Sequence, residues 1–467
     1  MKQNRFPAYI LALCFLLILA SCGKPPVGKL IITKVPSGQA TPNMLTGENW
    51  RYIPRAVIAI VDPGKASSEK ILTSDFYSAC SPDISWDGDR IVFAGQKKQS
   101  DPWQIYEMNL KSRKYRQVLN IDGNCTDPVF LPLDKVIFTK NVTPSDSSLK
   151  TGYELYVCNA DGSGMQQITF HPYADFATTV LKDGRLLVVS KEIAPEQQNP
   201  SLVALRPDGT KADIFYKGAP GTSLISRSHE ADEKVYFIES DANGKSEIIS
   251  VRYNRPLHSR QQVSSDNKGN FSSVFPSLNG NLLVTYNEGS GSSYAVYELD
   301  KTTGKPVKNV FSSNGFDVVD ALQVDVHQRP KKLPSEVDMG VKTGLIMCQD
   351  INFKGIGIMD PLSKKAVKIE VMGIDSSLGI IPVESDGSVY LKIIADMPFR
   401  IQTLDERNKV VYSGSDWLWL RPNERRGFVG FGVDEEVAPM NRVPKAVKKD
   451  PVSVPVIKMF EKEVELE

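Results

Sequence analysis

A repeated strand pattern in the middle of the chain constrains the fold more than any other feature of the sequence. A turn containing Asp or Asn, and often Gly, precedes a three-residue apolar strand, which is followed by a polar loop and a second strand. The apolar strand recurs about every 45 to 50 residues, the period expected of four-stranded propeller blades. Its five clear copies begin at Ile91, Val136, Leu186, Val235 and Leu282. The pattern therefore predicts a β-propeller.

The segments around these copies fit the same fold. Turns such as Trp86–Asp89 carry Asp and Gly, which tolerate left-handed backbone or bond their own main chain. Second strands such as Trp103–Met108 alternate polar with apolar residues, as a strand with one packed face should. We expect Ala56–Asp62 to form the inner part of a further unit and Gly344–Cys348 to supply a closing strand. The expected ring has six or seven blades.

The repeat pattern fades beyond Asp320, and a different domain is expected there. Gln328–Pro334 has the composition of a linker, and three strands are predicted at 366–371, 387–394 and 398–404. These strands suit a small β-sandwich beside the propeller. The predicted fold is all-β: a six- or seven-bladed propeller with a small, sandwich-like C-terminal domain. The predicted boundaries are 1–21 for a signal peptide, 22–54 for an N-terminal tether, 55–360 for the propeller, 361–447 for the C-terminal domain and 448–467 for a tail.

The first residues have the pattern of a bacterial lipoprotein signal. Lys2 and Arg5 precede an apolar stretch over 8–20, and small residues lead to Cys22. The apolar stretch is shorter than the roughly 18 residues of a membrane span, which argues against the alternative of a permanent transmembrane anchor. We expect cleavage before Cys22 and acylation of that residue, so that lipid chains hold the protein at the cell envelope. Gly23 favours export to the outer membrane, facing the periplasm or the cell surface, although sorting rules differ between phyla.

Composition excludes several classes of function. The chain has 56 Lys and Arg against 55 Asp and Glu, without a basic block that interleaves aromatic residues, so nucleic acid is not an expected partner. No C-x-x-C pair occurs, and His171, His229, His258 and His327 are scattered. Each histidine is therefore interpreted as a surface or loop residue, and no metal site is predicted. No nucleophile elbow or phosphate-binding glycine loop is present, and no catalytic residue is assigned.

Two cysteines leave an alternative open. Cys80 and Cys125 precede equivalent strands of successive repeats, and in an oxidising compartment a disulfide between them is conceivable. Inert buried thiols explain the same residues equally well. The sequence does not decide between the two.

One repeat resembles a known family. Ser81–Phe93 followed by Ile105–Asn109 is similar to the repeat of TolB-like propellers, in which S-P-D-G-x-x-I-x-F precedes I-Y-x-M-D. The resemblance implies the propeller fold and says little about function.

The C-terminal segment resembles a second, narrower family. It is similar to the hydrazine synthase alpha subunit in five runs, at 382–390, 395–398, 402–405, 415–417 and 421–427. The resemblance implies a c-type haem motif directly after Gly427, in which two cysteines attach the haem and a histidine binds its iron. Phe428, Phe431 and Gly432 occupy those three positions here. No cofactor is therefore expected, and the two phenylalanines are expected to fill space that haem occupies in relatives.

Two functions follow from these patterns. The first is a membrane-anchored, non-catalytic scaffold whose propeller binds a protein partner or a small ligand. The second is a subunit of a hydrazine-synthase-like redox complex whose haem or metal is supplied by another chain. The missing thiols favour the first, and enzymatic activity of this chain alone is not expected.

Overall fold

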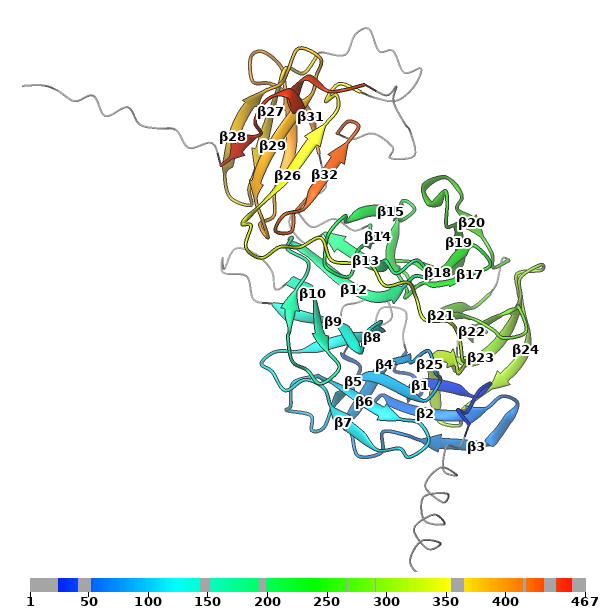
Figure 1. Ribbon diagram of the computed structural model, residues 1–467. Coiled ribbons are helices and arrows are strands. Elements are labelled where there is room, and N and C mark those ends of the chain that lie inside the picture. Colours follow the sequence, from blue (N-terminus) through cyan, green and yellow to red (C-terminus); the bar gives the residue numbers. More distant parts are fainter. Residues whose placement is uncertain are drawn as a thin grey trace, which may run out of the picture.

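The computed structural model describes residues 24–40, 52–142, 152–192, 199–265, 268–289, 291–353, 365–414, 417–431 and 442–455. These residues form an all-β propeller with a separate pair of sheets near the C-terminus, which confirms the predicted fold class (Figure 1). Two short 3-10 helices, η3 (Pro256–His258) and η4 (Lys445–Lys448), are also described. Among the described residues, no helix has the length and hydrophobicity needed to cross a bilayer. The predicted signal peptide and Cys22 lie outside the described residues.

The strands of the propeller fall into units of four or, in one case, five strands that follow one another around the ring. The first complete unit contains β4 (Ser78–Ile84), β5 (Arg90–Gln96), β6 (Gln104–Asn109) and β7 (Tyr115–Gln117). The next contains β8 (Cys125–Leu131), β9 (Lys135–Val142), β10 (Gly152–Asn159) and β11 (Gln166–Gln167). A parallel bridge between Tyr153 and Ala174 joins it to the following unit, which contains β12 (Tyr173–Val180), β13 (Leu186–Glu192), β14 (Ser201–Leu205) and β15 (Asp213–Lys217).

Two further units and a composite one complete the ring. One contains β16 (Thr222–Ile225), β17 (His229–Ala231), β18 (Lys234–Asp241), β19 (Ser246–Arg252) and β20 (Gln261–Gln262). The other contains β21 (Asn270–Pro276), β22 (Leu282–Asn287), β23 (Ala295–Asp300) and β24 (Lys305–Phe311). The composite unit joins β25 (Phe316–Gln323) to β1 (Leu30–Pro36), β2 (Val57–Asp62) and β3 (Lys65–Ile71). The described strands thus form six units.

Burial explains why the three-residue apolar strand is the strongest repeat signal. The side chains of Ile91, Val92 and Phe93 on β5 are fully buried, and those of Val136, Ile137 and Phe138 on β9 are at most 1% exposed. These strands are covered on both faces, which removes the polar residues that would alternate in a sheet with one wet face. Each such side chain contributes roughly 1.5 to 3 kcal/mol by leaving water. The outer strands, such as β7 with three exposed residues, lack this signal.

The ring closes differently from the prediction. The closing contact is an antiparallel pairing of β25 with β1, in which Leu30 lies opposite Gln323 and Thr33 opposite Asp320. The predicted tether over 22–54 therefore contains a propeller strand. Gly344–Cys348, predicted to close the ring, instead belongs to β26 (Thr343–Cys348) of the C-terminal sheets. Apolar content predicted the strand at Gly344–Cys348 but not its pairing partner, which depends on contacts between distant segments, and no strand was predicted at Leu30–Pro36.

The C-terminal domain consists of two four-stranded sheets that enclose one apolar core. One sheet contains β32 (Arg425–Phe428), β26, β29 (Val389–Ile394) and β33 (Val452–Val454), and the other contains β28 (Ser377–Pro382), β27 (Lys368–Met372), β30 (Arg400–Leu404) and β31 (Val410–Ser413). Their shared core includes Ile346, Ile369, Leu391, Phe399 and Leu420. The strands predicted at 366–371, 387–394 and 398–404 correspond to β27, β29 and β30.

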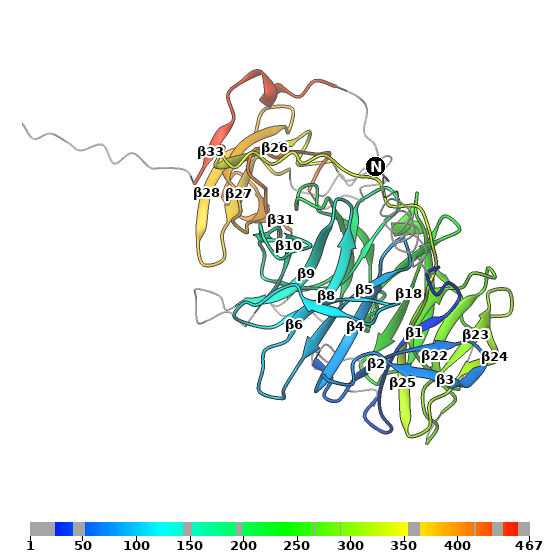
Figure 2. The ribbon, with the colours of Figure 1, turned by 60° about the horizontal axis from the view of Figure 1, so that its bottom comes forward.

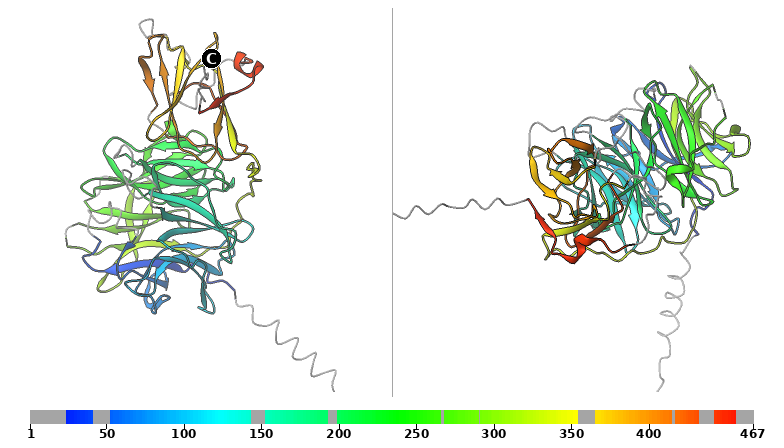
Figure 3. Two further views of the ribbon diagram at one scale, coloured as in Figure 1. Left: turned by 90° about the vertical axis from the view of Figure 1, so that its left-hand side faces the viewer. Right: turned by 90° about the horizontal axis from the view of Figure 1, so that it is seen from above.

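The C-terminal domain sits over one edge of the propeller. Figure 1 and the left view of Figure 3 show its sheets next to the unit that contains β12 to β15, and Figure 2 shows the segment before β26 running along the ring. That segment touches the turn before β13, where Lys331 N donates to Lys182 O at 3.0 Å. A Cβ atom on Gly184 would lie 2.1 Å from Lys331 O, so only glycine permits this approach.

Candidate functional site

A small polar cavity lies among the innermost strands of the propeller. Its volume is about 100 Å³, and its wall takes residues from β1, β4, β8, β12, β16, β21 and β25. Pairing of the inner strands with their neighbours shifts register at equivalent places, after Cys80, Thr126 and Phe176. Ser81, Asp127 and Ala177 adopt positive φ at these irregularities. Such bulges re-aim side chains, and here they mark the lining of the cavity.

The cavity brings acidic groups close to one arginine. Asp127 and Asp320 line it together with Arg227, whose Nη1 donates to Pro82 O at 3.0 Å. Asp127 Oδ2 accepts from Ala177 N at 2.9 Å, and Asp83 Oδ2 accepts from Phe130 N at 3.0 Å, so each of these carboxylates also links two neighbouring units. Asp127 therefore joins two units while lining the cavity, and Asp83 joins two units without being part of that lining.

Burial dominates the electrostatics of this cavity. It raises the pKa of Asp83 to about 6, against the opposing charge of Arg227, and it also raises the pKa of Asp320. Burial and the nearby Arg227 lower the pKa of His229 to about 3, so its imidazole is neutral at pH 7. The cavity can therefore offer a small polar molecule one cation, Arg227, a neutral imidazole, His229, and the Asp320 carboxyl group with its raised pKa.

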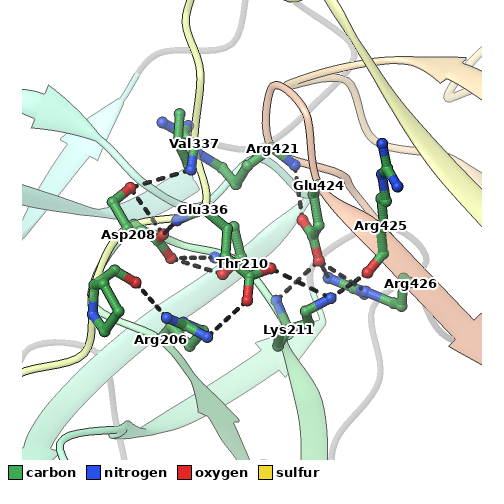
Figure 4. A network of polar contacts seen from close by, with 12 residues as sticks. Arg206, Asp208, Thr210, Lys211, Glu336, Val337, Arg421, Glu424, Arg425 and Arg426 are labelled. Carbon is green, nitrogen blue, oxygen red and sulfur yellow. Dashed lines mark hydrogen bonds and ion pairs between the residues drawn. The ribbon is translucent and has the colours of Figure 1, made fainter.

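A second polar constellation holds the C-terminal domain on the propeller. Figure 4 shows Glu424 between Lys211, Arg421 and Arg426. Glu424 is fully buried, and its Oε1 accepts from Lys211 N of the propeller at 2.9 Å and from Arg426 Nη2 at 2.8 Å. Arg426 Nη1 donates a second hydrogen bond to the propeller, to Ala212 O at 3.3 Å. The charged run 424–426 is thus an interdomain contact, a role that the sequence did not reveal.

The linker before β26 joins the same constellation. Asp208 Oδ2 accepts from Glu336 N at 2.8 Å and from the Ser335 hydroxyl at 3.0 Å, and Arg206 pairs with Glu336 at 2.8 Å (Figure 4). Burial opposes ionisation of Asp208, but the hydrogen bonds from Thr210, Glu336 and Ser335 lower its pKa overall. The carboxylate therefore stays charged and fixes the linker.

The positions of the expected haem motif lie at the end of this interdomain strand. The rings of Phe428 and Phe431 are 5.8 Å apart and pack against the apolar core of the C-terminal domain, and Gly432 lies outside the described residues. Cys348 lies opposite Phe428 in the parallel pairing of β26 with β32, but it is one buried thiol whose pKa burial raises to about 12. Thioether attachment of c-type haem requires two thiols. The described residues do not fit such a haem here.

The cysteines of the propeller are buried thiols. Cys80, Cys125 and Cys158 belong to one apolar cluster, and the structure contains no disulfide between Cys80 and Cys125. Burial raises the pKa of Cys80 and of Cys125 to about 12, which suppresses the reactive thiolate. Of the two alternatives, the structure has the inert thiols.

The histidines occupy unlike environments. The interpretation of all four as surface or loop residues was wrong for His229, which is half-buried on a strand, and His171 lies in a loop but is buried. His258 and His327 are exposed, and His229 lies on β17 with its ring 4.8 Å from that of Phe275. His171 is buried beside Glu154 and Asp175, with its Nε2 3.3 Å from Asp175 Oδ2. His171 and Asp175 are four residues apart in the sequence, so the interpretation of the histidines as scattered, with no nearby ligand, was wrong for His171.

Comparisons with known proteins point to one family. Residues 325–432 match the family model described as the hydrazine synthase alpha subunit middle domain. Hydrazine synthase subunit alpha from Kuenenia stuttgartiensis is 22% identical over 86% of this chain and 65% of its own length. This chain therefore spans 65% of that relative. The match to the family model begins near the linker and covers most of the two C-terminal sheets.

A solved structure of hydrazine synthase supports the fold. A structure of Kuenenia stuttgartiensis hydrazine synthase matches with a TM-score of 0.76 at 18% identity, covering 91% of this chain and 71% of that one. TolB from Acinetobacter baumannii matches with a TM-score of 0.45 at 14% identity, over 68% of this chain and 71% of that one. The resemblance to hydrazine synthase alpha subunits predicted from the residues is confirmed.

The raised pKa of Asp83 predicts a specific dependence of stability on pH. An acid whose pKa is higher in the folded state than in the unfolded state stabilises the fold below the unfolded pKa and loses that contribution as pH rises through the folded pKa. As the pH rises from about 4 to about 6, ionisation of Asp83 should therefore lower the free energy of unfolding by about 2 kcal/mol. Asp83→Asn keeps the acceptor for Phe130 N and should remove this loss. Urea unfolding of both proteins at pH 4 and pH 7 measures it, and an equal difference at both pH values would contradict the assignment.

The buried Glu424 predicts a large loss on neutralisation. Glu424→Gln leaves the guanidinium of Arg426, only 4% exposed, without its anion, and should lower the unfolding free energy of the C-terminal domain by about 3 kcal/mol. Protease cleavage in the linker should also become faster. Glu384→Gln removes the exposed pair with Lys449 and serves as the matched control, with an effect within about 0.5 kcal/mol. Equal effects of the two substitutions would show that the interdomain contact does not stabilise the domain.

Proposed function

We propose that this chain is a hydrazine-synthase-alpha-like subunit that acts as a non-catalytic, lipid-anchored scaffold within a complex of several chains. The observation that carries the proposal is the pair Phe428 and Phe431 at the positions of the thioether cysteines, packed on the core of a domain that otherwise retains the family's frame. The domain keeps its fold but lacks the two thiols that would attach a haem covalently. This combination supports a role in binding for the chain.

The arrangement of the two domains supports a scaffold. Ordered contacts cross between propeller and sandwich at Glu424, at Arg421 Nη1 with Gln167 O at 3.0 Å, and at Trp417 N with the Tyr173 hydroxyl at 3.0 Å. A platform held by buried polar contacts presents its loops in fixed positions, which lowers the cost of ordering them on binding. The polar cavity at the centre of the ring offers a place for a small ligand.

A second candidate function rests on the same family. The chain then acts within a redox complex and contributes to a site whose haem or metal another subunit holds. The similarity to hydrazine synthase subunit alpha favours this candidate, because that relative is named as a subunit of an enzyme. The two candidates differ in the identity of the partner, since a scaffold requires a bound partner and a redox subunit requires a cofactor-bearing one.

Purification from the native membrane tests the proposal. The full chain, solubilised in mild detergent, should bring down at least one protein at comparable abundance and should show no covalent haem of its own on a denaturing gel stained for peroxidase activity. A cytochrome at comparable abundance supports the redox candidate, and a partner without a cofactor supports the scaffold. A chain that purifies alone, or that carries covalent haem itself, overturns the scaffold proposal.

The anchor has a test of its own. Cys22→Ser should block lipidation and leave an unprocessed precursor, because the acylated residue supplies the thiol. Mass spectrometry of the N-terminal peptide should find acyl groups on Cys22 in the unmodified chain and none in the variant. Cys14→Ser, which replaces a cysteine within the apolar stretch, should not change processing. A mature N-terminus upstream of residue 22 would show that the anchor is absent.

A further inference from the structure

The buried group Glu154, His171 and Asp175 lies where the propeller meets the C-terminal domain. Glu154 is on β10, Asp175 is on β12, and His171 precedes β12. The side chain of Glu154 is 6% exposed, that of Asp175 is 3% exposed and that of His171 is 2% exposed. One nitrogen or oxygen atom from each residue can be chosen so that all three lie within 4.8 Å of one another. Three ionisable side chains thus converge in a place that water hardly reaches.

The atoms that face one another have too few hydrogen-bond partners. His171 Nε2 is 3.3 Å from Asp175 Oδ2, and His171 Nδ1 is 3.9 Å from Glu154 Oε2. Within the described residues, His171 Nδ1 and Asp175 Oδ2 have no hydrogen-bond partner. A buried polar atom left without a partner costs about 1 to 3 kcal/mol, so such atoms in a native protein call for an explanation.

The other oxygens of the carboxylates are held in place. Asp175 Oδ1 accepts from the Ser190 hydroxyl at 2.6 Å, and Glu154 Oε1 accepts from His171 N at 3.1 Å. The Thr169 hydroxyl donates to Glu154 Oε2. Contacts of this kind orient the ligands of metal sites and fix which atoms face the ion.

The charge of the group is not balanced by basic side chains. In the part of the chain that the structure describes, neither Glu154 nor Asp175 has an ion pair with lysine or arginine. Burial raises the pKa of both carboxyls, and burial lowers the pKa of His171. The group must therefore either hold protons or hold a cation, because two buried carboxylates with a neutral imidazole leave two negative charges uncompensated.

Aromatic side chains from both domains cover the group. The ring of Tyr173 lies 4.3 Å from that of His171, and the ring of Trp419 in the C-terminal domain lies 4.6 Å from it. The Trp419 indole nitrogen also lacks a hydrogen-bond partner among the described residues. The C-terminal domain thus helps to cover a site whose three ionisable groups all belong to the propeller.

We propose that Glu154, His171 and Asp175 bind one divalent transition-metal ion, with Zn²⁺ as the ion that fits their donors best. One imidazole nitrogen and two carboxylate oxygens form a donor set found in zinc sites, where bonds of about 2.1 Å place tetrahedral ligands about 3.4 Å apart. The distance between His171 Nε2 and Asp175 Oδ2 is already 3.3 Å. Because Trp419 closes the site, the ion stabilises the docked arrangement of the two domains.

Metal content and stability of the full chain test the site. The chain is stripped with chelator, dialysed and titrated with Zn²⁺ alone. We expect about one Zn²⁺ ion per chain. When free Zn²⁺ is at about 100 times its Kd, the thermal unfolding midpoint should rise by about 5 °C. His171→Ala should lose both the ion and the rise. His327→Ala, which removes an exposed histidine outside this group, should keep both.

Two further readouts keep the test decisive. Asp175→Asn preserves the shape of the side chain and its acceptor for Ser190, so it should fold even if His171→Ala does not, and it should bind Zn²⁺ at least tenfold more weakly. In the Co²⁺-loaded chain, the visible absorption of tetrahedral cobalt should disappear in the same variants. A stripped chain that takes up no ion, or a Zn²⁺ response that persists in both variants, overturns the proposal and leaves the carboxyl groups protonated around a neutral imidazole.

Discussion

The pairing of β25 with β1 is the contact on which the rest of the molecule depends. A propeller built from successive units has one seam, and an open seam would leave the main-chain groups of two strands without partners. The seam here joins segments that are almost 300 residues apart, with Leu30 opposite Gln323. It also brings Asp320 to the wall of the central cavity, and Lys34 Nζ on β1 donates to the Ser313 hydroxyl, just before β25, at 3.0 Å. Closure and cavity therefore form together.

The contact between the two domains depends on buried charge. Glu424 is buried beside Arg426 and reaches the propeller through Lys211 N. A buried carboxylate of this kind adds little to stability compared with apolar packing, but removing one partner is costly because the other charge remains buried. Such a contact tolerates few alternative arrangements. It therefore fixes the position of β32, and with it the position of Phe428 and Phe431, relative to the ring.

The two proposals rest on two different places near the contact between the domains: the end of β32, and the buried polar group under Trp419. At the end of β32, aromatic rings stand where the family resemblance implies thiols, and apolar packing replaces attachment. On the propeller side, polar atoms without partners converge under Trp419. The first site has gained apolar contacts, whereas the second retains unbalanced polar groups. An ion at the second site would hold together the same two domains that Glu424 joins.

The sequence by itself determined the all-β class, the propeller repeat and the resemblance to hydrazine synthase alpha subunits. These follow from local patterns, because strands such as Ile91–Phe93 are buried on both faces and must be apolar throughout. Only the tertiary structure decided that β1 and β25 close the ring, that Gly344–Cys348 belongs to the sandwich and that His171 lies between two carboxyls. Each of these depends on contacts between segments that lie far apart in the chain or on how strands pair. The local pattern of apolar and charged residues does not specify which distant residue will become the partner.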